Sequence, residues 1–115
     1  MAEPIGPPPT YFAFIERYPQ LQVAWDKIHE AEVQGPLDEK TIRLVKLGIA
    51  IGAMKEGAVH AGVRKAVAAG VAPAAIEQLV ALSAGTIGLP SAVAIFSWIR
   101  EHLETAPIQE LPLGQ

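Results

Sequence analysis

The chain has no cysteine among its 115 residues. This absence excludes disulfide bonds, cysteine-ligated metal sites and catalysis by a thiolate. It also excludes a thiol-dependent peroxidase, because that mechanism needs one thiolate to attack the peroxide and a second thiol to resolve the intermediate.

Charged side chains are also scarce. They make up 18% of the residues, against about 25% in a typical soluble domain. The nine basic residues are dispersed, and Arg64-Lys65 is the only adjacent pair, so a net charge of −3 leaves no basic patch for nucleic acid or an anionic membrane. Half of the residues are hydrophobic, and there are too few charged side chains to cover the surface of a small monomer. Some apolar surface should therefore be buried against other subunits, which predicts self-association.

No signal peptide is visible, since residues 1–4 are not followed by a basic region and an apolar run, and a cytoplasmic location is expected. The stretch Gln78–Ile99 lacks charge and is long enough to cross a bilayer. Gly85, Gly88 and Pro90 interrupt it, however, which favours two buried helices over a membrane span.

Glycine and proline divide the rest of the chain into helical segments with short connections. The apolar spacing predicts an all-α single domain of five to six helices over residues 10–105, preceded by an extended Pro-rich arm at 1–9 and followed by a loose arm at 106–115. Gly35-Pro36 should end one helix, and Gly70 another as a left-handed cap. The charge-free stretch Leu47–Met54 should be buried on all sides, with a break between Gly52 and Lys55.

The helix expected over Lys55–Gly70 organises the domain. Two sets of residues recur along it at helical spacing, a small-residue face and a polar stripe. The small-residue face contains Lys55, Ala58, Gly62, Ala66 and Ala69, and the stripe contains Glu56, His60 and Arg64. Because a glycine inside a helix costs about 1 kcal/mol relative to alanine, we expect a neighbouring helix or a ligand close to Gly62.

Glu56 and His60 lie one helical turn apart, so the carboxylate can orient the imidazole for general acid–base catalysis. The alternative is an exposed pair that adds a few tenths of a kcal/mol to helix stability. The other histidines, His29 and His102, lie near distant helix ends, and no metal site is predicted. No cofactor motif, such as a Gly-rich phosphate loop, is present.

Several segments in order resemble the carboxymuconolactone decarboxylase and alkylhydroperoxidase D family over residues 20 to 100. The order is a Gly-Pro-Leu-Asp start, a buried helix, a helix ending in Ala-Ala-Gly, a helix with Ala-Pro-Ala-Ala-Ile-Glu-Gln-Leu, and then Ile-Gly-Leu-Pro. The resemblance implies an all-helical protein that forms trimers or hexamers, in agreement with the self-association expected from composition.

The motif residues of the family do not carry over. Its peroxidase members have a glutamate on the buried helix, then Cys-x-x-Cys, then a histidine four residues later. The matching positions here hold Arg43, Lys55, Ala58 and Gly62. The decarboxylase branch also has a histidine where Gly62 stands. The chain therefore resembles a branch in which Glu-Gly-Ala-Val-His replaces the cysteine motif.

Lys55 takes the position of the first family cysteine. If it were buried, the neutral amine would be favoured and could act as a nucleophile or base. With Arg43 it could instead bind a carboxylate substrate. The alternative places both cations in salt bridges between subunits.

These observations lead to one hypothesis and one rival. The hypothesis is a cysteine-free homo-oligomer that binds a small organic acid through Arg43 and Lys55, with acid–base or decarboxylation (lyase) chemistry by Lys55, Glu56 and His60. The rival is a catalytically silent structural or interaction homo-oligomer. A polar pocket around Lys55 and His60 would favour the first.

Overall fold

The structure is a computed structural model that describes residues 7–105. Within that range the chain forms six helices and no strand, which confirms the all-α prediction. The helices are α1 (Pro9–Arg17), α2 (Pro19–Glu32), α3 (Glu39–Gly52), α4 (Glu56–Ala68), α5 (Pro73–Ile87) and α6 (Leu89–Thr105).

The contacts of the chain divide it into two compact units at Asp38–Glu39. Helices α1 and α2 belong to the first unit and α3 to α6 to the second. The domain bounds proposed from the sequence stay a prediction. Of the two expected arms, residues 1–6 and 106–115 lie outside the described residues, and α1 already begins at Pro9.

The first unit is a pair of helices joined at Tyr18. Prolines stand in the first turn of both α1 and α2, where a missing N–H group leaves no intrahelical bond unmade. The Tyr11 hydroxyl donates to Gln22 Oε1 at 3.2 Å, and the rings of Phe14 and Tyr18 lie 5.2 Å apart. Neither helix has a buried residue, so this unit exposes most of its apolar face.

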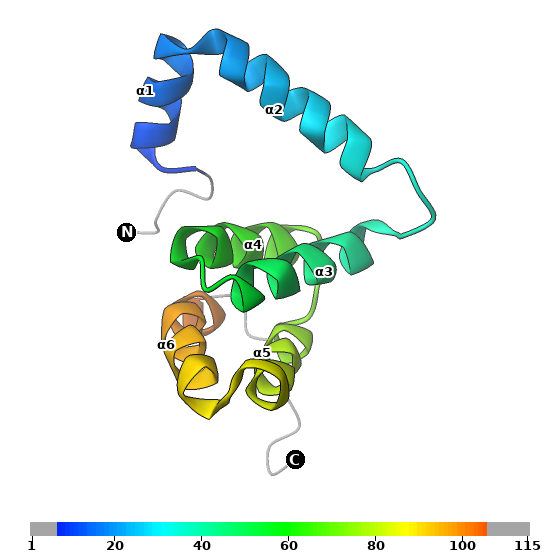
Figure 1. Cartoon of the computed structure of the whole chain (residues 1–115), viewed down its shortest axis with the longest axis vertical. Coiled ribbons are helices and arrows are strands. Elements are labelled where there is room, and N and C mark those ends of the chain that lie inside the picture. The colour runs from blue at the N-terminus through cyan, green and yellow to red at the C-terminus, as the bar shows by residue number, and fades with distance from the viewer. Residues whose placement is uncertain (1–6, 106–115) are drawn as a thin grey trace. The chain divides into compact units, whose positions relative to one another are not determined.

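The second unit is a four-helix bundle (Figure 1). Helix α3 packs on α4 and α5, and α6 packs on the same two helices, so the four form a closed ring in the order α3, α4, α6, α5. The core inside the ring is aliphatic. Its largest fully buried side chains are Leu47, Ile76, Ile95, Ile99, Val59 and Val63.

Helix α4 ends in a Schellman motif, as the glycine predicted. Gly70 has φ +89°, its N–H donates to Val67 O at 3.0 Å, and the Val71 N–H donates to Ala66 O at 2.9 Å. Gly70 is thus the left-handed residue after the helix. A side chain at this position would be strained, because L residues other than Gly avoid positive φ.

Helix α3 ends in the same motif with a different residue at its centre. The Met54 N–H donates to Ile51 O at 3.0 Å, the Lys55 N–H donates to Ala50 O at 3.1 Å, and Met54 has φ +54°. The predicted break between Gly52 and Lys55 is confirmed. The left-handed residue is Met54 rather than a glycine, however, and this strained turn sets the position of Lys55.

The prediction that Leu47–Met54 is buried on all sides is wrong for the single chain. Leu47 and Ile51 are buried, but Ile49 is 66% exposed. The reason is that α3 has only two helical neighbours in the ring, which leave a third side open. Many large apolar side chains are exposed in the same way: Phe12, Phe14, Tyr18, Leu21, Val23, Trp25, Ile28, Val33, Leu37, Val45, Ile49, Met54, Leu82, Leu89, Val93 and Phe96.

The close approach predicted at Gly62 is confirmed. A methyl group built at this position would lie 3.0 Å from Leu47 Cδ1 and 3.6 Å from Leu47 Cα. The missing side chain therefore lets α3 and α4 pack tightly. Among the described residues, no helix combines the length and apolar character needed to cross a membrane.

Candidate functional site

Two histidines from different helices meet at one edge of the bundle. The distance from His60 Nδ1 on α4 to His102 Nε2 on α6 is 2.7 Å, and the ring centroids lie 4.9 Å apart. The pair is 42 residues apart in sequence and forms because α4 and α6 pack side by side. Sequence reasoning missed His102, which it placed far from His60.

The backbone positions of the pair follow from the core. His60 follows the fully buried Val59 on α4, and His102 lies one turn after the fully buried Ile99 on α6. Both histidines therefore stand at the rim of the core, where one side of each ring is packed and the other reaches solvent. The cluster is held by rigid helices rather than by a loop.

Glu56 extends this contact into a chain of three groups. His60 Nε2 lies 3.2 Å from Glu56 Oε2, one helical turn earlier on α4. A carboxylate can only accept a hydrogen bond, so His60 Nε2 carries a proton and donates the hydrogen bond to Glu56. In a neutral His60 ring, Nδ1 then accepts from His102 Nε2–H. The Glu56–His60–His102 cluster thus has an assigned direction for each hydrogen bond.

Exposure differs along the cluster. The Glu56 side chain is 57% exposed and that of His60 is 28% exposed, so the carboxylate is the member open to an incoming molecule. The imidazole pair lies behind it. This arrangement can exchange a proton at the carboxylate while the two rings hold that carboxylate in place.

Lys55 directly precedes Glu56 and is the N-cap residue of α4, with no hydrogen bond from its side chain to the cap. It is exposed in the chain. The burial on which a role as nucleophile or base depended is therefore absent in the single chain. Its role in binding an acid stays a prediction.

Arg43 is not brought to the cluster within one chain. With a rise of about 1.5 Å per residue, its backbone lies about 14 Å along α3 from Gly52, and the chain turns toward Lys55 only after that glycine. Arg43 instead lies toward the Gly70 end of α4, where Lys40 also approaches. Its pairing with Lys55 stays a prediction.

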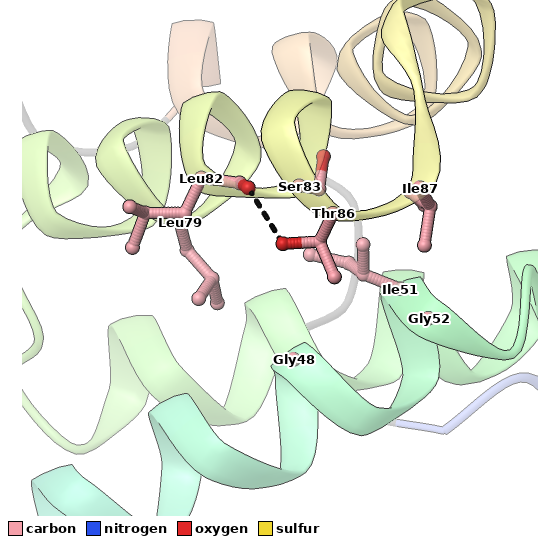
Figure 2. A pocket seen from close by; sticks show the side chains of 8 residues that line it. All are labelled: Gly48, Ile51, Gly52, Leu79, Leu82, Ser83, Thr86 and Ile87. Atoms are coloured by element: carbon pink, nitrogen blue, oxygen red, sulfur yellow. Dashed lines mark hydrogen bonds between the residues drawn. The ribbon is translucent and has the colours of Figure 1, made fainter.

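A cavity of about 160 Å³ lies elsewhere, between α3 and α5 (Figure 2). It shares no residue with the Glu56–His60–His102 cluster. Its walls are formed by Gly48, Ile51, Gly52, Leu79, Leu82, Ser83, Thr86 and Ile87. Within residues 7–105, no group of three or more His, Cys, Asp or Glu side chains is arranged to hold a metal ion.

Comparison with known proteins gives one finding. A family model described as CMD, the carboxymuconolactone decarboxylase family, matches residues 19–101. Curated proteins and solved structures were also compared, and neither comparison found a match to this chain.

Proposed function

The chain belongs to the carboxymuconolactone decarboxylase family, and we propose that it is a cysteine-free member that binds a small organic acid and exchanges a proton with it at the Glu56–His60–His102 cluster. The observation that carries this proposal is the hydrogen-bonded chain of one carboxylate and two imidazoles. Thiol-dependent peroxidase activity is excluded, because the sequence contains no cysteine.

The proposed chemistry starts at Glu56, the most exposed member of the cluster. Its carboxylate takes a proton from a C–H or O–H group of the bound acid, and the electron pair of that bond stays on the substrate. His60 keeps the carboxylate in place by donating from Nε2, and His102 keeps the His60 tautomer by donating to Nδ1. His60 and His102 are therefore positioning residues, and Glu56 is the catalytic base.

Lys55 supplies the positive charge for the substrate carboxylate in this proposal. It stands next to Glu56 at the first turn of α4, where the backbone N–H groups also favour an anion. Binding one carboxylate there would place the rest of a small acid within reach of Glu56. In a decarboxylation, the C–C bond to the substrate carboxylate would break, its electron pair would stay on the substrate carbon, and Glu56 in its protonated form would return a proton to that carbon.

Self-association forms the second half of the proposal. The exposed apolar side chains of α3 and α6, among them Ile49, Val93 and Phe96, support a homo-oligomer, with three or six copies as the expected sizes. In such an oligomer, Arg43 of one copy would approach the site that contains Lys55 of a neighbouring copy.

A binding experiment tests the first part. Thermal unfolding is measured with acetoacetate, levulinate and malonate, and with the matching amides as neutral controls. An acid present at a hundred times its Kd should stabilise the folded state by about 2.7 kcal/mol. Lys55→Met should abolish this shift, whereas Lys27→Met, which removes an exposed cation in the first unit, should leave it unchanged. Equal shifts in both variants would contradict the role of Lys55.

A proton-exchange experiment tests the second part. Incorporation of solvent deuterium into levulinate is followed by NMR with equal amounts of each variant. Glu56→Gln should slow the protein-dependent exchange by about 10²- to 10⁴-fold, the usual contribution of a general base. Glu77→Gln changes an exposed carboxylate on α5 and should leave the rate unchanged. His102→Gln should alter the pH profile of exchange more than the affinity for the acid.

The exposure of Lys55 favours the rival function, a catalytically silent structural homo-oligomer. In that case the Glu56–His60–His102 cluster only joins α4 to α6. The same experiments separate the two functions: for a silent protein no acid raises the unfolding temperature, while His60→Gln and His102→Gln still lower it.

A further inference from the structure

The cavity between α3 and α5 has the size of a small ring. Its volume of about 160 Å³ is close to that of an engineered apolar cavity of about 150 Å³ in another protein, which stays dry and binds benzene. It is open to solvent on one side, where Leu82 is 60% exposed. A molecule of this size can therefore enter without unfolding either helix.

The walls select against charge. None of the lining residues is ionisable, and the side chains that face the space are mostly aliphatic, from Ile51, Leu79, Leu82 and Ile87. A charged group placed there would lose water without gaining a partner, which is strongly unfavourable. The occupant that fits is a neutral molecule with an apolar body.

One polar atom gives the cavity a direction. Thr86 Oγ1 lies between α5 and α3 and donates its hydrogen to Leu82 O at 3.2 Å (Figure 2). A hydroxyl has one hydrogen and two lone pairs, so this oxygen can still accept. Ser83 Oγ donates to Val80 O and is drawn on the side of α5 away from α3. The site therefore suits a ligand that carries one hydrogen-bond donor.

Two glycines keep the space empty on the α3 side. A methyl group at Gly48 would lie 3.8 Å from Leu79 Cδ1, and one at Gly52 would meet no atom within 4 Å. Alanine is therefore sterically allowed at both positions and would favour the helix. A methyl group at either position would instead take up part of the space between the two helices.

We propose that this cavity is a binding site for a neutral, single-ring molecule that carries one hydroxyl group, which donates to Thr86 Oγ1 while the ring packs on Leu79 and Ile87. The site is separate from the proposed acid–base cluster, and neither depends on the other. The fluorinated probe 4-fluorophenol has this chemistry, and ¹⁹F NMR reports its binding to the full chain directly.

The expected result is a saturable change in the ¹⁹F signal of 4-fluorophenol. The double variant with Gly48→Ala and Gly52→Ala should weaken binding by about tenfold or more, because its methyl groups occupy the cavity. Thr86→Val should weaken the binding of 4-fluorophenol by about threefold to tenfold, because one hydrogen bond to the ligand is lost. The same variant should leave fluorobenzene, which lacks the hydroxyl, unchanged.

Two controls make the test specific. Gly57→Ala adds a methyl group on α4 with nothing within 4 Å, outside the cavity, and should bind the probe like the unaltered chain. The charged probe 4-fluorobenzoate should bind at least about tenfold more weakly than 4-fluorophenol. The proposal is overturned if 4-fluorophenol does not saturate, as when a second copy covers the cavity, or if the double variant binds it within twofold of the unaltered chain.

Discussion

Gly62→Ala tests how tightly α3 and α4 pack against each other at this glycine. Alanine has the better helix propensity, and this effect alone would stabilise the chain by about 1 kcal/mol. The new Cβ would lie 3.0 Å from Leu47 Cδ1, where ordinary contacts lie at 3.4–4 Å. Leu47 is fully buried, so it can move only by displacing packed neighbours.

The two effects oppose each other, and the steric one should win. Overpacking a well-filled core costs about 1–3 kcal/mol, so we expect a net loss of up to about 2 kcal/mol for Gly62→Ala. Gly62→Leu should lose more and could disturb assembly. The matched control is Gly57→Ala on the same helix, which has open space around it and should be stabilised by up to about 1 kcal/mol.

Urea unfolding followed by circular dichroism measures these differences as shifts of the midpoint at constant m-value. A double-mutant cycle identifies the side chain responsible. Leu47→Ala removes Cδ1 together with Cγ and Cδ2 at a cost of about 2–5 kcal/mol, and in that background Gly62→Ala should become stabilising. If Gly62→Ala is as stabilising as Gly57→Ala in the unaltered chain, the argument from close packing is refuted.

Four further outcomes are expected. Gly70→Ala should lower the free energy of unfolding by about 1–2 kcal/mol, because a side chain at φ +89° is strained. Met54→Gly should raise it by up to about 1 kcal/mol in the same assay, since it relieves the corresponding strain at the end of α3, and a loss would show that the Met54 side chain contributes more than the strain removes. Peroxide turnover with dithiol reductants should equal the blank without protein, and a saturable, metal-free rate would contradict this. Light scattering should give three or six times 12.2 kDa, and a persistent monomer at micromolar concentration would contradict the inferred self-association.

Much of the fold could be predicted from glycine, proline and apolar spacing, because these act locally. Gly70 ends α4 through its own backbone conformation, and Pro19 and Pro73 stand in the first turns of α2 and α5. Met54 could not be predicted, since methionine, unlike glycine, has no preference for positive φ. The partial exposure of α3 could not be predicted either. The apolar sequence indicates that Ile49 needs a packing partner, but it does not indicate whether that partner belongs to the same chain.

The candidate site divides in the same way. Glu56 and His60 are one turn apart, so helical geometry alone predicts their contact. His102 joins them only through the packing of α4 against α6, which no local pattern encodes. A signal was nevertheless present, since His102 lies one turn beyond the apolar run of α6, at the boundary between its buried and polar parts. Arg43 was paired with Lys55 because both occupy positions of the family motif. Since the motif residues themselves are replaced in this chain, those positions do not indicate how far apart the two side chains lie.

The division of the chain into two compact units has a spectroscopic consequence. The chain has two tryptophans, and one falls in each unit: Trp25 on α2, where it contacts the His29 ring, and Trp98 on α6, packed against the bundle core. Each indole therefore reports the unfolding of its own unit. Fluorescence of Trp25→Phe and of Trp98→Phe should follow one common transition if residues 10–105 form a single cooperative domain. Separate midpoints would instead show that α1 and α2 unfold independently of the four-helix bundle.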